Sequence, residues 1–285
     1  MSTFNTTRFC QAFKCQFLVL RKTWIRLFGI FTLVMFMANL FFTRVSGTKY
    51  DYMISHWDME AVWRTYNNYV QSTVAFGLIF FCFAMLAAAS LMFSGMKDTR
   101  KRSAFLLWPV SNLEKYVISI ILSVFWMMVI TFAAYVLADA MRVFVDWVTG
   151  RIIIWGVPIV FTQVFGQAVF HNDWQMVWWF FTIVFYIHSL YIVGGTLFRR
   201  QQFLFTSATI AVVGILFMML LQQTNPDVEY ITGTWDEKTE TYHQIFHPFF
   251  YILNTTLCAL IVFHYWASYK LFTRIQVINN KWLNV

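Results

Sequence analysis

Six apolar blocks, each long enough to cross a lipid bilayer, decide what this sequence can fold into. A helix needs about 20 predominantly apolar residues to cross a hydrocarbon core ~30 Å thick. The blocks lie near 27–43, 70–94, 116–138, 176–198, 203–222 and 248–268. Because a segment in lipid has to satisfy its own backbone hydrogen bonds, each block is predicted to be a transmembrane helix.

The composition supports a membrane protein. Only 12% of the residues are charged and 59% are hydrophobic, whereas about 25% of the residues of an ordinary soluble domain are charged. We therefore expect an all-α polytopic membrane protein with a single transmembrane domain over 1–285. The net charge of +8 does not indicate a nucleic-acid partner, because the basic residues collect beside the apolar blocks, where membrane topology explains them.

The distribution of charge orients the six predicted spans. Six spans place the segments 1–26, 95–115 and 199–202 and the tail after 268 on one side, and these hold fifteen of the 21 lysines and arginines. Eleven of the 13 acidic residues fall on the other side. Since basic loops stay in the cytoplasm, both termini are predicted to be cytoplasmic, with 139–175 and 223–247 extracytoplasmic.

Within the two extracytoplasmic segments, two local structures are expected. The stretch 152–170 is apolar but contains Gly156, Pro158 and Gly166, which weaken a lipid-facing helix, so it is predicted to be re-entrant or to lie on the membrane surface. The alternative is a seventh span, which would move the basic C-terminal tail to the opposite side. In 223–247, alternating polar and aromatic residues flank a DEKT turn, which predicts a small β-hairpin.

The segment before the first span is predicted to be an amphipathic elbow helix over 1–26. Phe9, Phe13, Phe17, Leu20 and Trp24 recur there at helical spacing, and basic residues flank the stripe. Such a helix lies in the membrane interface and contacts lipid headgroups. The periodicity leaves open whether it also touches a cytoplasmic partner.

The cytoplasmic loop between the second and third spans carries the most informative local pattern. Ser111 and Glu114 have the S-x-x-E spacing of a capping box, which predicts a helix start at the head of the third span. Pro109 disfavours helical geometry at Trp108, so a helix within 98–107 has to end there. The result is a short basic helix that displays apolar side chains, and such an exposed apolar surface is typical of a docking site.

This loop, SGMKDTRKRSAFLLWPVSNLEKYV, resembles the corresponding loop of bacterial type-2 ABC transporter permeases (the ABC-2 type). The resemblance extends loosely to the whole chain, with its elbow helix, six spans, cytoplasmic termini and re-entrant segment. It implies a multi-pass permease subunit of an exporter in the bacterial inner membrane. This subunit would pair with a second permease copy or a paralogue and bind a separate ATPase subunit, which would carry ATP and Mg, through the loop's coupling helix, residues 98–112. The coupling residues implied are Arg100, Lys101, Arg102, Phe105, Leu106, Leu107 and Trp108.

The rest of the sequence contains no recognisable catalytic constellation. No GxxxxGK[ST] phosphate loop, Cys-x-x-Cys pair or HExxH motif occurs, so we expect neither enzymatic activity nor a bound cofactor or metal. His188, Asn254 and Thr255 lie within predicted spans and are candidates for a translocation path. Two alternatives remain open: a redox or haem-binding subunit that uses His188 and His264, and a non-transporting immunity or assembly subunit.

Overall fold

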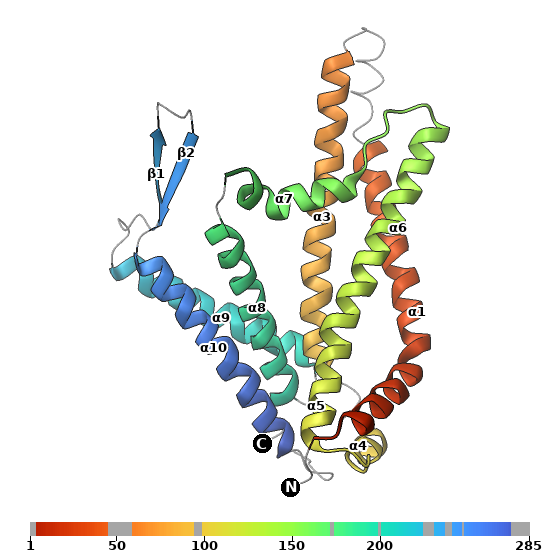
Figure 1. The fold of residues 1–285 in the computed structure, drawn as a ribbon, viewed down its shortest axis with the longest axis vertical. Helices are drawn as coiled ribbons and strands as arrows, with labels where there is room; N and C mark the ends of the chain where they lie inside the picture. Colours follow the sequence, from red (N-terminus) through yellow and green to blue (C-terminus); the bar gives the residue numbers. More distant parts are fainter. Residues whose placement is uncertain are drawn as a thin grey trace. The chain divides into compact units, whose positions relative to one another are not determined.

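The computed structural model describes residues 4–44, 59–93, 99–171, 174–198, 201–224, 231–236, 241–246 and 248–274. Over these residues the chain is helical, apart from turns and one two-stranded hairpin (Figure 1). The elements in chain order are α1 (Thr6–Arg44), α3 (Met59–Leu91), α4 (Thr99–Leu106), α5 (Asn112–Ile120), the π-helical segment η3 (Ile121–Trp126), α6 (Met127–Val148), α7 (Gly156–His171), α8 (Trp174–Leu197), α9 (Gln202–Thr224), β1 (Ile231–Asp236), β2 (Thr241–Phe246) and α10 (Pro248–Thr273).

Five helical stretches in the described part of the chain are long and apolar enough to cross a membrane. They are Thr6–Arg44, Glu60–Leu91, Asn112–Val148, Val177–Leu197 and Phe250–Thr273. Five of the six predicted blocks therefore lie in such helices. The sixth block, 203–222, lies in α9, whose described apolar part Gln202–Leu216 is shorter. The chain is thus a multi-pass helical membrane protein, and the sixth span stays a prediction.

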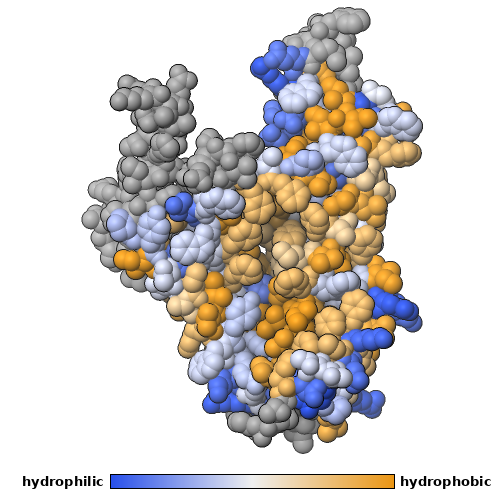
Figure 2. All heavy atoms as spheres, in the orientation of Figure 1, coloured by the Kyte–Doolittle hydropathy of each residue, from blue (hydrophilic) through white to orange (hydrophobic). Residues whose placement is uncertain are grey.

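The outer surface of the helices is rich in hydrophobic side chains. Figure 2 shows them covering much of the face that is drawn, with hydrophilic residues mostly nearer the helix ends. Large apolar side chains such as Leu33, Ile79, Phe125 and Val262 are exposed. Water would disfavour so much exposed apolar surface, whereas lipid accommodates it.

The first helix differs from the expected elbow followed by a separate span. α1 is continuous from Thr6 to Arg44, and Figure 1 shows it bending along its length. No proline or glycine occurs between its start and Gly29, so nothing in the sequence ends a helix near residue 26. Within its apolar stripe, Phe17 packs edge-on against Trp126 with ring centroids 4.8 Å apart.

The third span is also longer than its apolar block. The segment 139–175 is expected to be extracytoplasmic, and α6 continues into it as far as Val148. Arg142 forms ion pairs with Asp139 and Asp146, three and four residues away along α6, and these pairs allow the helix to continue. After a turn at Gly150, whose φ is +67°, α7 begins at Gly156 and runs across α3 and α6 rather than alongside them (Figure 1). Its described apolar part, Gly156–Gly166, is shorter than the five candidate spans, and the surface-lying or re-entrant course stays a prediction.

The predicted hairpin is present. β1 and β2 pair antiparallel in a register that runs from Ile231 opposite Phe246 to Asp236 opposite Thr241. The predicted DEKT turn begins with Asp236, the last residue of β1, and its other residues lie outside the described part of the chain.

The described residues form two compact units. The first unit combines the parts of Met1–Phe9, Leu86–Ser123 and Gln167–Val285 that the structure describes, and the second combines those of Cys10–Met85 and Val124–Gly166. The core of the second unit joins α1, α3 and α6 around Met35, Val74, Ala134, Tyr135 and Ala138. The expectation of one membrane domain over 1–285 stays a prediction.

In the first unit, α8 and α10 pack in parallel. Trp179 meets Phe250 near the start of both helices, and His188 meets Tyr265 further along both. α9 connects α8 to the hairpin that precedes α10 and runs back along the chain's path. Its first turn packs on the end of α8, where Gln202 Nε2 donates to the Gly195 carbonyl oxygen at 2.7 Å.

Candidate functional site

The loop with the most informative sequence pattern forms a short helix followed by a tight turn. α4 ends at Leu106, and the next residues continue into α5 at Asn112 through backbone hydrogen bonds. The Leu107 N–H donates to the Ser103 carbonyl at 2.9 Å, and the Val110 N–H donates to the Trp108 carbonyl at 2.8 Å. The predicted end of the helix before Pro109 is therefore correct.

The apolar side chains of this loop divide into an inner group and an exposed tip. Phe105 is half-buried and packs against Phe272 of α10, with centroids 6.2 Å apart. Trp108 is half-buried and lies 6.1 Å from the Phe105 ring. Leu107, in contrast, is 82% exposed. Of the predicted docking anchors, Phe105 and Trp108 thus support the loop from inside, and Leu107 is its outward tip.

The basic rim is described only in part. The Arg100 side chain is exposed. Lys101, Arg102 and Leu106 belong to α4, but their side chains lie outside what the structure describes.

The capping box at the head of α5 is present as predicted. The Glu114 N–H donates to the Ser111 hydroxyl oxygen at 3.3 Å, and the Ser111 N–H donates to Glu114 Oε2 at 2.7 Å. Ser111 has the extended backbone of an N-cap residue, with φ −66° and ψ 155°. Such a cap typically contributes about 1 kcal/mol.

Glu114 has a second set of partners that the sequence pattern does not indicate. Its carboxylate is fully buried and also receives the Asn5 N–H at 2.9 Å and both Nε and Nη2 of Arg8, at 3.0 and 2.8 Å. Together with the bond from Ser111, these hydrogen bonds divide equally between the two carboxylate oxygens. The first residues of α1 are thereby tied to the head of α5. Asn5 and Arg8 lie more than 100 residues before Glu114 in the sequence, so no local spacing could reveal the pair.

The two intramembrane histidines are hydrogen-bonded between α8 and α10. His188 Nδ1 lies 3.1 Å from the Tyr265 hydroxyl, and His264 Nδ1 lies 2.9 Å from the Ser189 hydroxyl. Each bond therefore joins α8 to α10. Within the described residues, no three histidine, cysteine or acidic side chains lie close enough to hold a metal ion.

The other candidate path residues lie in α10 and face different surroundings. Asn254 is fully buried, and neither its amide oxygen nor its amide nitrogen has a hydrogen-bond partner within the described part of the chain. Thr255 is exposed, and its hydroxyl donates back to the Tyr251 carbonyl at 2.8 Å. The two residues therefore do not share a lining surface.

A buried ion cluster in the second unit was not expected from the sequence. Arg142 of α6 is fully buried and pairs with Asp139 at 2.7 Å and Asp146 at 2.9 Å. Tyr66 of α3 donates to Asp146, and Arg44 at the end of α1 pairs with Asp146 at 3.1 Å. The signal was available as D-x-x-R-x-x-x-D, because residues three and four apart on a helix are neighbours.

The same cluster sets the start of α7. Asp139 Oδ2 accepts the N–H groups of Gly156 and Val157 at 2.9 and 3.2 Å, and Arg142 Nη2 donates to the Ile154 carbonyl at 2.6 Å. A carboxylate at a helix N-terminus satisfies N–H groups that have no partner in the helix itself. Gly156 permits this approach, because a Cβ there would lie 3.0 Å from Asp139 Oδ1.

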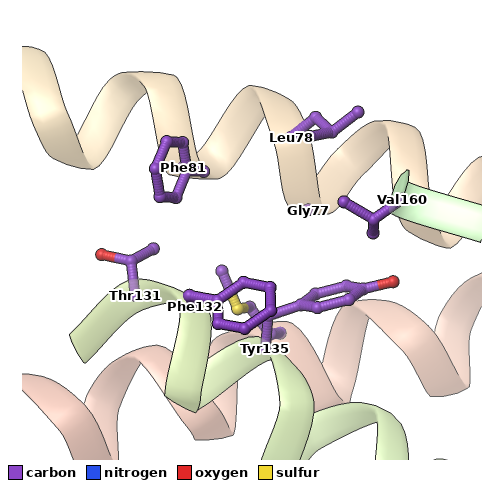
Figure 3. A pocket seen from close by; sticks show the side chains of 8 residues that line it. Gly77, Leu78, Phe81, Thr131, Phe132, Tyr135 and Val160 are labelled. Carbon is purple, nitrogen blue, oxygen red and sulfur yellow. The ribbon is translucent and has the colours of Figure 1, made fainter. Parts of the chain in front are cut away.

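A small cavity lies beside this cluster but has no features of a ligand site. Its volume is about 30 Å³, and Figure 3 shows Gly77 and Phe81 of α3 facing Thr131 and Tyr135 of α6 across it. The Thr131 hydroxyl already donates to the Met127 carbonyl at 2.8 Å. The remaining lining is hydrophobic, so the space is a packing gap of about the size of one water molecule.

Comparison of the chain with protein-family models, with curated proteins and with solved structures finds no match.

Proposed function

We propose that this chain is the membrane-spanning permease subunit of an ATP-binding-cassette exporter and that it binds its ATPase subunit through α4 and the turn after it. The observation that carries the proposal is Leu107, which is 82% exposed at the end of a basic helix. A large apolar side chain held out at the end of a basic helix is suited to docking, since a partner's apolar pocket would remove it from water.

The geometry behind Leu107 supports this role. The contact between Phe105 and Phe272 holds the loop against α10, and the capping box fixes where α5 begins. A tip on such a support loses little conformational entropy when it docks, so more of the contact energy is available for binding. A displacement of Leu107 by a bound partner would be transmitted directly to the long helix formed by α5, η3 and α6.

The course of the last three helices supports six spans. Because α8 and α10 run in the same direction side by side, the chain between them has to return across the distance that α8 covers, and α9 is the helix that does so. Six spans place both termini on one side. The charge distribution favours the cytoplasmic face of a bacterial inner membrane for that side.

In the proposed mechanism, the separate ATPase subunits bind ATP and Mg, and their closure moves the coupling loops of two permease copies or of this chain and a paralogue. α3 and the α5–α6 helix flank the loop in sequence and act as levers. Their movement alternates access to a path between the two permeases.

The proposal is tested with Leu107→Asp in the full chain, co-expressed with the ATPase from a neighbouring gene. A charge in a desolvated contact is expected to weaken recovery of the ATPase at least about tenfold, which corresponds to about 1.4 kcal/mol. Leu107→Met, which keeps the apolar bulk, is the matched control and should bind like the wild type. Adding Trp108→Ala should deepen the loss.

Folding is monitored by size-exclusion profile and thermal midpoint in detergent. Since the Leu107 side chain contacts little of its own chain, both should stay unchanged in Leu107→Asp. A folded Leu107→Asp protein that retains the ATPase at wild-type level would remove the coupling role from this loop.

A further inference from the structure

The contact between the chain's first residues and the head of α5 exceeds what a helix cap requires. A capping box needs only Ser111 and Glu114, and both of its hydrogen bonds are present. Glu114 nevertheless accepts three more hydrogen-bonding groups, from the Asn5 backbone and from two nitrogens of Arg8. The additional partners join two parts of the chain that no local folding rule brings together.

Burial explains why the Arg8 side chain matters at this place. The Glu114 side chain is fully buried, whereas Arg8 is 34% exposed and reaches in from the surface. A buried carboxylate needs an opposite charge and satisfied lone pairs. Arginine provides both through a planar fork that bonds the two oxygens at once, which a lysine cannot reproduce.

The segment that connects Glu114 to Leu107 at the tip of the loop is very short. Only six residues lie between Leu107 and Glu114 in the sequence. Backbone hydrogen bonds at Leu107 and Val110, together with the cap at Ser111, leave this connection little freedom. A change in how Glu114 is held therefore changes the direction in which Leu107 points.

We infer that Arg8 is a positioning residue for ATPase coupling: its fork on Glu114 locks the start of α1 to the head of α5 and so fixes the orientation of the Leu107 tip. This inference rests on the proposed function. It assigns a role to the first turn of α1. The coupling loop holds its correct orientation for the ATPase only when that turn is in place.

The test compares Arg8→Ala, Arg8→Lys and Leu107→Asp in the full chain reconstituted in nanodiscs with the ATPase subunit. Arg21→Ala is the matched control, because it removes one exposed arginine from the same helix. Two quantities are measured for each variant: the affinity for the ATPase, and the hydrogen–deuterium exchange of the backbone amides from Ser111 to Lys115.

Arg8→Ala is expected to weaken ATPase binding about tenfold and to speed amide exchange at 111–115, because Glu114 loses its fork. Arg8→Lys should fall between Arg8→Ala and the wild type in both measurements, and Arg21→Ala should match the wild type. Leu107→Asp should lose ATPase binding with unchanged exchange, since it alters the tip and not its support.

The outcomes separate this inference from the proposed function. If Leu107→Asp loses the ATPase while Arg8→Ala keeps it, the coupling function stands and the positioning role of Arg8 is wrong. Faster exchange in Arg8→Ala with normal binding also contradicts the positioning role, since the contact then only stabilises the fold. If the wild-type chain binds no ATPase, both proposals are wrong. If Arg8→Lys equals the wild type in ATPase affinity and in amide exchange, the bidentate arginine contact is not required.

Discussion

Arg142 is an arginine in a helix that crosses apolar surroundings, and its environment explains how it is tolerated there. Its hydrogen bonds reach Asp139, Asp146, the Tyr66 hydroxyl and the Ile154 carbonyl. Desolvation of a charged group is expensive, and a buried ion pair offsets it only when the geometry satisfies the remaining donors. With Arg44 on Asp146, two cations balance two carboxylates, so the cluster is neutral as a whole.

Removing the central cation should therefore be far more damaging than removing a similar one from the surface. Arg142→Ala leaves Asp139 and Asp146 buried with reduced compensation and is expected to lower the free energy of unfolding by about 3–5 kcal/mol. Arg64→Ala, which breaks the exposed Glu60–Arg64 pair, is the control and should change it by less than about 1 kcal/mol. The measurement is the midpoint of unfolding in detergent, and similar midpoints for the two variants would contradict the structural role of the cluster.

Interactions between single residues can be predicted from the sequence when the two partners are close along the chain. The capping box of Ser111 and Glu114 was predictable because its two members are three residues apart. Asp139, Arg142 and Asp146 could have been found in the same way. Arg8 could not, because its partnership with Glu114 depends on tertiary structure, and the same holds for Tyr66 on Asp146.

Among the elements, the packing of α3 against α8 depends on a missing side chain. A Cβ at Gly195 would lie 2.6 Å from the Ser90 carbonyl oxygen and 3.1 Å from that of Ala89. These are backbone atoms at the end of α3, so the helices would have to separate. Small residues at such contacts allow transmembrane helices to approach closely.

Gly195→Ala is accordingly expected to destabilise the protein by about 1–3 kcal/mol through overpacking. Gly214→Ala in α9 is the matched control, since nothing lies within 4 Å of a Cβ at that position. It should be neutral or stabilise its helix by up to about 1 kcal/mol. Unfolding midpoints of the two single variants check the prediction, which is wrong if Gly195→Ala is as stable as Gly214→Ala.

The elements themselves were predicted better than their ends. Apolar length located the helices, but it placed the end of the third span at 138 because charged residues follow, and the ion cluster makes those residues compatible with helix. The segment expected as an elbow and the first span form one continuous helix, because a change from basic to apolar composition does not end a helix unless a residue that breaks helices stands there. The hairpin was predictable from alternation and turn residues alone.

For the whole molecule, the number of membrane crossings decides on which side each loop lies. Six spans put the α6–α7 turn and the hairpin outside and the end of α10 inside. Five spans would place the two ends of the chain on opposite sides, and a seventh span over α7 would separate the α6–α7 turn from the hairpin.

Single cysteines distinguish these topologies with a membrane-impermeant thiol reagent on intact cells. Ile153→Cys and Thr241→Cys should both be labelled, whereas Arg274→Cys should be labelled only after permeabilisation. The four native cysteines are expected within helices or on the inner side, so the unmodified protein serves as the background. Labelling of Arg274→Cys beside a protected Thr241→Cys in intact cells would contradict six spans and indicate five or seven. Protection of an Asn172→Cys variant, which lies between α7 and α8, would then indicate the seventh span.

The π-helical turn in the middle of the third span has a consequence for insertions and deletions. η3 contains more residues per turn than the α-helices on either side of it, so the chain after it is out of step with an uninterrupted α-helix. Deleting one residue of η3, such as the exposed Phe125, would restore an ordinary helix without rotating the chain downstream, because the wider turn absorbs one extra residue. Deleting one residue within α6 would instead rotate everything downstream by about 100°. Substitutions at this surface position should therefore be harmless, and a one-residue deletion should be tolerated in η3 but not within α6.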